Sequence, residues 1–467
     1  MRWRKLVTRW CSIQVGLIAA AIPLALSAQS PMPAALPEDI LPGLKPLLEQ
    51  AIKQSPSMLA ASIDLASAEA YAYTDRSGLW PSVSGYGRYA HTETAVSAKT
   101  SSRTKTDGPL YGVSLSQPVF YWGSLKAQAD IGTLRTRIAE RQYAEAYRLL
   151  VLSIRSQYLS VIQKKVTWRN QRFALKAAES NLSLQEARLR DGRISEGDVM
   201  APRLQVDESR IYADKAQEDY DSSRRTLARL AGAPDISDDL IPTEIPKPTF
   251  ARETVGAFFE QMKKSGADNT ILLQTYVDAI RQSDLTYRIA KTRLYPKFLF
   301  SVNYDLQNQT NVDAAKTPTL TAINTLTVGF GANWTIFDGF ATRGAKLSAL
   351  AAKRLAEQRL KTFKESTSES AASLEKQIGF SGRLMDLTET RRSLADAAVT
   401  KVGNDVKSGV SPQTALDAVT QTANTAELAA YTARASFLSS WSEYVSMLGA
   451  DPALNNLPPR YLRNGKQ

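Results

Sequence analysis

Cysteine and histidine are almost absent from this chain, which has one of each in 467 residues. Cys11 lies in an N-terminal segment that we expect to be removed, so the mature protein is predicted to contain no disulfide and no thiolate metal site. His91 stands in a polar, tyrosine-rich stretch, where a solvated side chain is the expected role. With a single histidine and a single cysteine, the chain does not have the residues for a Ser-His-Asp triad, a zinc site or most acid–base mechanisms. We therefore expect no enzyme, no metal site and no cofactor.

Long apolar runs are absent after residue 28, so no later segment is predicted to form a transmembrane helix. The N-terminus differs, because a basic segment precedes an apolar run at 15–26 that is short for a bilayer span. The basic residues are Arg2, Arg4, Lys5 and Arg9. This pattern predicts a signal peptide over residues 1–28 with cleavage after Ala28, and an N-terminal anchor helix is the alternative. Cys11 does not sit in a lipoprotein cleavage site, so no acyl anchor is expected.

Acidic residues are fewer than basic ones, and the formal net charge is +12. An excess of positive charge suits nucleic acid as a partner. Here, however, Lys and Arg alternate with Asp and Glu along the polar stretches, as on a solvated helix face. No basic patch is interleaved with stacking aromatic residues, so we predict no nucleic-acid partner.

The chain does contain an internal repeat. Gly409 follows Gly192 by 217 residues (409 − 192), and both lie in short turn sequences between helical stretches. The same spacing separates two further pairs, Phe120 with Phe337 and Gly232 with Gly449. Three landmarks at one offset predict that the chain is built from two copies of one structural unit.

Each copy reads as helix, strand, polar loop, strand, long helix, turn and helix. We predict a first repeat at 29–232 and a second at 252–449. The prolines of residues 233–251 predict an extended linker between them, and 450–467 is predicted to be a short tail. In the first repeat we expect an opening helix at 45–79.

Two strands are predicted in each repeat, near 80–91 and 110–120 and then near 297–307 and 325–334. The polar segment from Thr92 to Pro109 is expected to be a loop. In the second repeat, apolar residues alternate with small or polar ones, which is the period of a strand with one apolar face. A transmembrane β-barrel strand and a soluble sheet with one wet face share this pattern, so the strands alone leave both open.

The helical stretches are long. Ser124 to Asp191 contain no proline, nor do Phe340 to Ser408, and each would reach roughly 100 Å as a helix. Apolar residues recur at spacings of three and four, which indicates coiled-coil-like packing. The opening helix and residues 195–231 are together about as long as one of these stretches. We therefore expect these two short helices, stacked end to end, to run beside one long helix.

Four strands cannot close a membrane barrel, and an open sheet edge is not tolerated in lipid. Membrane barrels begin at about eight strands. The missing strands are expected to come from other copies of the chain in a closed cyclic oligomer.

Motifs in both repeats resemble those of the TolC-type outer-membrane factor family, over about 45–450. An opening motif at Ala51–Pro56 is followed by helix-to-strand turns, strand-to-helix turns and two hairpin tips, in the same order in each repeat. The turns and tips are Leu79-Trp80-Pro81, Leu294-Tyr295-Pro296, Ser116–Phe120, Trp334–Gly339, Arg188–Ser195 and Lys407–Ser411. Ser55 departs from the family, where Asn is usual at that position.

The resemblance implies a mainly α fold with a transmembrane β-barrel that is completed by trimerisation. A homotrimer would place one twelve-stranded barrel in the lipid of the outer membrane and a helical tunnel across the periplasm. The protein would be the passive exit duct of a tripartite efflux or type I secretion system. A periplasmic adaptor and an inner-membrane transporter would be its partners.

The resemblance also implies roles for residues near the two hairpin tips. Adaptor docking would involve Gly192, Arg193, Ile194, Ser195, Gly409, Val410 and Ser411. The glycines also fit the alternative role of capping helices in the left-handed conformation. Asp417 and Thr414, with Asp198 in the first repeat, correspond to the family's narrow periplasmic mouth, where a ring of acids attracts cations. The alternative for Asp198 and Asp417 is that of ordinary acids near a helix N-terminus.

Two other classes remain as alternatives to a channel. A periplasmic coiled-coil adaptor should have a single hairpin flanked by lipoyl-like segments, and a soluble coiled-coil scaffold should lack a signal peptide. The 217-residue duplication with four amphipathic strands favours the channel. The sequence does not identify the cargo.

Overall fold

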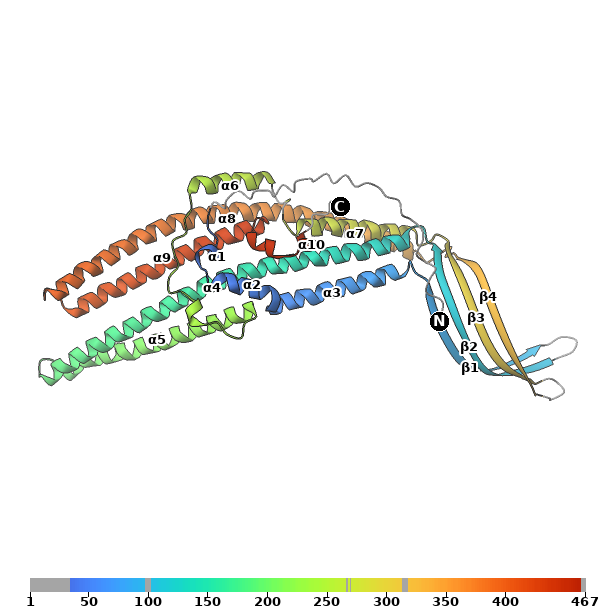
Figure 1. Cartoon of the computed structure of the whole chain (residues 1–467), viewed down its shortest axis with the longest axis horizontal. Coiled ribbons are helices and arrows are strands. Elements are labelled where there is room, and N and C mark those ends of the chain that lie inside the picture. The colour runs from blue at the N-terminus through green and yellow to red at the C-terminus, as the bar shows by residue number, and fades with distance from the viewer. Residues whose placement is uncertain (1–33, 97–101, 266–267, 269, 313–317, 463–467) are drawn as a thin grey trace, which may run out of the picture.

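The computed structural model describes residues 34–96, 102–265, 268, 270–312 and 318–462. Helices run along an elongated, gently curved body, and a four-stranded sheet extends from one end of it (Figure 1). No helix in these ranges is both long and apolar enough to span a bilayer. The predicted signal peptide at 1–28 lies outside the described residues.

The first repeat contains the helices and strands that build one half of the body and sheet. They are α1 (Pro37–Ile40), α2 (Leu44–Gln54), α3 (Pro56–Ser77), β1 (Ser82–Val96), β2 (Ser102–Phe120), α4 (Ser124–Arg190) and α5 (Glu196–Ala231). The opening helix expected at 45–79 is two helices, which is a correction. Proline cannot donate the backbone hydrogen bond that a continuous helix needs, so Pro56 begins a new helix after an extended Ser55.

The second repeat follows a short 3₁₀ turn at Asp238–Leu240. Its elements are α6 (Arg252–Ser265), α7 (Leu273–Lys291), β3 (Lys297–Val312), β4 (Pro318–Asn333), α8 (Ala341–Lys407) and α9 (Gln413–Met447). The long helices α4 and α8 both contain 67 residues. The first residue of α8 follows the first residue of α4 by 217 positions (341 − 124), and the last residues have the same spacing (407 − 190). The two long helices predicted from the sequence are therefore present at the predicted spacing.

The helices form one layer in which α4 is interior. It packs against α3 and α5 on one side and against α7 and α9 on the other. In turn α8 packs against α7 and α9, so it lies at one edge of the layer, while α3 and α5 form the opposite edge (Figure 1). The shorter helices α3 and α5 thus run beside α4, as their lengths predicted, and α7 and α9 run beside α8 in the same way.

The sheet is antiparallel, in the order β1-β2-β3-β4. Its strands are longer than predicted, which corrects the loop expected from Thr92 to Pro109. In that segment, residues 92–96 pair with 102–106, and Pro109 pairs with Tyr89. The ends of β3 and β4 also extend past the predicted bounds, to Val312 and Pro318. Backbone pairing holds these polar ends in the sheet although their side chains do not alternate in polarity.

Each repeat turns from sheet to long helix through two consecutive residues in the left-handed conformation. These are Trp122 (φ 55°) with Gly123 (φ 78°), and Gly339 (φ 61°) with Phe340 (φ 67°). Glycine adopts a positive φ without steric cost, whereas an aromatic residue does so only with steric strain. One glycine relieves each turn, and it occupies the second position in the first repeat and the first position in the second.

The segment at 233–251 is not a free linker, because three of its isoleucines are buried in the largest apolar cluster. They are Ile236, Ile241 and Ile245. The hydroxyl of Tyr158 on α4 donates to the carbonyl of Leu240 (2.5 Å), which fastens the segment to the helical layer.

The segment predicted as a tail is also part of the core, which corrects that prediction. It forms a 3₁₀ helix, Pro452–Asn456, and α10, Pro459–Leu462, and it buries Leu454, Leu457 and Tyr461. These residues cover the middle of α4, where most large apolar side chains of the first repeat gather.

Candidate functional site

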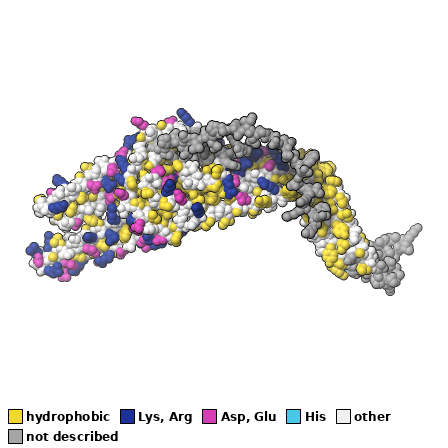
Figure 2. Space-filling model, in the orientation of Figure 1, with side chains coloured by type: hydrophobic (Ala, Val, Ile, Leu, Met, Phe, Trp, Pro, Cys, Tyr) yellow, Lys and Arg dark blue, Asp and Glu magenta, His cyan; other side chains and the backbone are white. Residues whose placement is uncertain are grey.

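The sheet has one apolar face that continues across all four strands. Val83, Leu115, Val302 and Val328 are cross-strand neighbours, and Tyr304 is paired with Leu326 one row away. Val83, Leu326 and Val328 are exposed, so this face has no cover within the chain. In Figure 2 hydrophobic side chains gather over the sheet, whereas charged side chains are spread over the helical part. A sheet of this kind suits contact with lipid.

The opposite face of the sheet is polar. Ser84, Ser114, Asn303 and Thr327 form one cross-strand row, and the Ser114 hydroxyl donates to Asn303 Oδ1 at 2.6 Å. In the next row the Tyr86 hydroxyl donates to Asp305. The strands therefore alternate between an apolar and a hydrogen-bonded face, as a wall between lipid and water requires.

Aromatic side chains collect where the sheet meets the helices. The Trp122 ring packs edge-on against Phe120 and Tyr295, with centroid distances of 4.9 and 5.1 Å. The Trp122 indole N–H donates to the carbonyl of Pro296 (2.7 Å), and that of Trp334 donates to the carbonyl of Leu294 (3.1 Å). Trp and Tyr favour the boundary between lipid and water, because the ring is apolar and its N–H or O–H remains hydrogen-bonded.

The two hairpin tips lie at the other end of the body (Figure 1), and both have the same backbone geometry. The N–H of Gly192 donates to the carbonyl of Leu189 (2.9 Å), and that of Arg193 to the carbonyl of Arg188 (2.9 Å). At the second tip the N–H groups of Gly409 and Val410 donate to the carbonyls of Val406 (3.1 Å) and Asp405 (2.8 Å). This pair of bonds is the Schellman cap, which requires a left-handed residue that glycine supplies.

The side chains beside the tip glycines face solvent. Val410 is 77 % exposed, although an apolar side chain gains by burial. Arg193 is also exposed, and its Nε lies 3.8 Å from Asp191. Ile194 is half-buried, while Ser195 is exposed and begins α5 as its N-cap. Ser411 is half-buried.

Asp198 makes the contact expected of an acid near a helix N-terminus. It is the third residue of α5, and its carboxylate accepts hydrogen bonds from the Ser195 N–H (2.9 Å) and hydroxyl (2.8 Å). The backbone bond, followed by the hydroxyl bond, holds the pKa of Asp198 below its usual range. Both bonds run from Ser195 to Asp198, and the first is the Asp198 half of a capping box at the start of α5.

Asp417 lies on the second turn of α9, half-buried, and accepts a hydrogen bond from Gln413 Nε2 at 3.0 Å. Thr414 is exposed one turn earlier. Asp198 and Asp417 belong to different hairpins, and each binds a residue of its own hairpin. A ring of acids would need further copies of the chain.

A buried ion-pair network in the middle of the body was missed by the sequence reasoning. The guanidinium of Arg155, which is 1 % exposed, donates to both carboxylate oxygens of Asp451 (2.6 and 2.9 Å) and to Glu38. These partners lie 296 and 117 residues away in the sequence. The signal in the sequence is an arginine among the apolar residues Val151, Ile154 and Tyr158 of one helix face, but nothing in the sequence identifies its partners.

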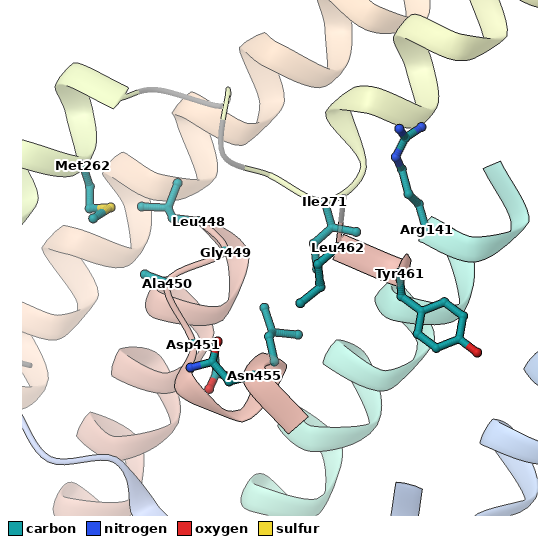
Figure 3. Close-up of a pocket in the computed structure, with 11 residues that line it drawn as sticks. Arg141, Met262, Ile271, Leu448, Gly449, Ala450, Asp451, Asn455, Tyr461 and Leu462 are labelled. Atoms are coloured by element: carbon teal, nitrogen blue, oxygen red, sulfur yellow. The ribbon is translucent and has the colours of Figure 1, made fainter. Parts of the chain in front are cut away.

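A pocket of about 300 Å³ lies beside this network, between α4, the turn after α9 and the C-terminal segment (Figure 3). Its two ionised side chains are already engaged, because Asp451 binds Arg155 and Arg141 pairs with Asp278. The rest of its lining is largely apolar and includes Ile271, Leu448 and Leu462. Within the described residues, no group of three or more His, Cys, Asp or Glu could hold a metal ion.

The first repeat matches a known family in sequence, and almost all of the chain matches solved structures in fold. Residues 47–233 match the family model for outer membrane efflux proteins. No curated protein matches the sequence. The CmeC outer membrane channel of Campylobacter jejuni has a TM-score of 0.68 at 13% identity, covering 90% of this chain and 89% of CmeC.

Two further channels have the same fold. The outer membrane protein VceC of Vibrio cholerae has a TM-score of 0.65 at 17% identity, covering 89% of this chain and 99% of VceC. The MtrE outer membrane channel of Neisseria gonorrhoeae has a TM-score of 0.63 at 14% identity, covering 87% and 89%. The first repeat thus carries the sequence signature of the outer membrane efflux proteins, and the resemblance of this chain to the TolC-type outer-membrane factor family is confirmed.

Proposed function

We propose that this protein is a passive exit duct that spans the outer membrane and the periplasm as a homotrimer. The observation that carries the proposal is the sheet, which has one apolar face, one polar face and two unpaired edges. β1 and β4 each pair on one side only. Unpaired backbone groups are costly in lipid, so these edges must meet strands of other copies. Three copies would supply twelve strands, within the range of known membrane barrels.

The edges of the helical layer support a head-to-tail contact between copies. On α8, large apolar side chains that point away from the protomer are exposed; they include Leu355, Phe380 and Leu394. On the opposite edge, α3 and α5 expose a second apolar set that includes Leu59, Ile63, Leu204 and Ile211. Two different complementary edges on one chain form a ring if the rotation between copies closes.

The tips at the far end of the body are the proposed contact with a periplasmic adaptor. Arg193, Ile194 and Val410 present charged and apolar side chains beside the tip glycines, and an exposed apolar residue at the end of a tunnel suits a partner surface. An inner-membrane transporter would supply the energy and select the cargo, since the described residues contain no metal-binding cluster and show no nucleotide-binding motif.

The gate is proposed at the same end. Three copies of Asp417, with Thr414 one turn away, would form a ring on the axis and attract cations. Asp198 is the weaker candidate, because its carboxylate is occupied by the cap of α5.

Extraction of the full chain in a mild detergent, followed by native mass measurement and planar-bilayer recording, tests the proposal. We expect a trimer that conducts ions. A monomer that stays in water without detergent, or a membrane-bound oligomer that does not conduct, would contradict it.

A further inference from the structure

A groove opens at the junction of sheet and helices, and the proposed duct does not account for it. Its volume is about 490 Å³, and it lies between the end of α7 and the start of α8. Its apolar lining comes from Leu294, Phe337, Phe340, Leu347 and Leu350.

The groove is continuous with the apolar face of the sheet. Leu294 in its lining receives the hydrogen bond from the Trp334 indole at the end of β4. Trp334 continues the alternation of Leu326, Val328 and Phe330, which belong to the apolar face. The groove therefore begins where the surface that suits lipid ends.

The rim of the groove carries unbalanced positive charge. Arg343 and Lys346 line it, and neither has an ion-pair partner among the residues that the structure describes. The one acid in the lining, Asp338, is engaged elsewhere. It accepts hydrogen bonds from the N–H (2.9 Å) and hydroxyl (2.6 Å) of Thr342, and it lies 3.9 Å from Arg293.

We propose that this groove binds one anionic phospholipid of the periplasmic leaflet, with an acyl chain along Leu294, Leu347 and Leu350 and the phosphate against Arg343 and Lys346. An apolar floor with a cationic rim at a membrane boundary complements an amphiphile whose headgroup is negative. The proposal rests on the outer-membrane placement given above.

The first repeat has a cavity of about 430 Å³ between α3 and α4, but its lining is mainly polar and mixes acids with bases, such as Glu69 and Arg137, so it does not suit an acyl chain. The position that corresponds to Lys346 is Ala129 (346 − 217), which is buried, and the position of Leu350 corresponds to Thr133. There α3 covers α4, and Arg76 donates to the Thr133 hydroxyl at 3.1 Å. One lipid per chain follows, and three per trimer.

Native mass spectrometry of the detergent-solubilised full chain tests the site, with palmitoyl-oleoyl phosphatidylglycerol and the matching phosphatidylcholine as probes. We expect up to three molecules of phosphatidylglycerol per trimer and weaker retention of phosphatidylcholine. The double variant Arg343→Ser with Lys346→Ser should lower phosphatidylglycerol binding roughly tenfold or more, because two cations near an anionic headgroup are lost. Arg359→Ser, an exposed arginine of the same helix below the groove, should leave it unchanged.

A second variant separates the apolar part of the site from its charge. Leu350→Trp fills the groove and should reduce both lipids. Equal binding of both probes to the unmodified protein overturns the lipid site, and so does phosphatidylglycerol binding that survives the double substitution. In either case a trimer that still conducts ions would leave the proposed function standing. If the double variant dissociates the trimer, the groove is a contact between copies and the lipid site is wrong. Failure to form any conducting oligomer would instead contradict the proposed function.

Discussion

The long helices α4 and α8 have the same length and the same place in their repeats, yet they differ in burial. Eighteen residues of α4 are buried, against nine of α8. Those of α4 include large apolar side chains such as Tyr147, Ile154 and Ile162, whereas those of α8 include small or hydroxyl residues such as Thr367, Ser381 and Gly382. One helix has neighbours on both sides and the other on one side only. The difference supports the proposal that α8 contacts another copy of the chain.

The hairpins that these two helices enter give the largest expected effect. Arg193→Glu combined with Ile194→Asp, at the tip after α4, should abolish export in cells, because it reverses the charge and removes the apolar character of the proposed docking surface. The trimer should remain in the membrane, since both side chains lie outside the core. Lys215→Glu, exposed on α5 away from the tip, is the control. Unchanged export would argue against docking at this tip, and a lost trimer would assign the residues to folding.

The interior position of α4 is tested at Arg155. Arg155→Met leaves Glu38 and Asp451 with uncompensated negative charge in the core. Breaking a buried pair in this way costs about 3–5 kcal/mol of unfolding free energy. Urea unfolding of the solubilised protein, followed by circular dichroism, would measure it. Arg359→Met on the exposed face of α8 should change stability little, and equal losses for the two variants would contradict the contrast between the helices.

The edge position of α8 is tested at Leu355 and Leu394, which are 51 % and 67 % exposed in the single chain. Leu355→Ser and Leu394→Ser should each weaken association of the copies by about 2 kcal/mol, the cost of leaving a leucine unburied. Sedimentation across a dilution series would show more monomer, with helical content unchanged. Lys376→Ser, exposed on the same helix, serves as the matched control. If association is unaffected by either leucine variant, another surface joins the copies.

The smallest effect is expected at the acids near the two tips. Asp417→Asn should lower cation preference and weaken block by multivalent cations in bilayer recordings, because the negative field of the ring is removed. Carboxylates that are in contact with water repel one another only modestly, so stability should change little. Asp214→Asn and Asp221→Asn, further from the tip on α5, should alter the current less. Selectivity that is the same in all three variants would place the gate elsewhere.

The long helices were predictable because their signal is local. Residues 124–190 contain no proline, and the turns that end α4 and α8 contain a glycine at the same offset, so sequence alone located both helices within a residue or two. The strands were predicted too short, because their outer halves lack alternating polarity and are held by backbone pairing, which sequence does not report. Gly108-Pro109 indicates a turn locally, yet both residues pair within β2.

What could not be predicted depends on contacts between distant parts of the chain. In sequence, the residues after 450 resemble a short tail. In the structure Asp451 pairs with Arg155, and Tyr461 packs against Tyr143 with a centroid distance of 4.7 Å. The role of Asp198 was open from sequence; Ser195 gives it a capping contact within the single chain, and its part in a gate stays a prediction. Asp417 stays a prediction, because the groups that would face it belong to other copies.

The packing of residue Ala34 has a consequence for the order of folding. Its carbonyl accepts the indole N–H of Trp441 at 3.1 Å, across 407 positions of sequence, and it forms a backbone bridge with Phe250. Because a chain emerges from the ribosome N-terminus first, the start of the described chain has to wait for almost the last helix before it can dock. The hairpin of α4 and α5 needs only neighbouring sequence and can form early. Completion of the protomer is therefore a late event that joins the two ends of the chain.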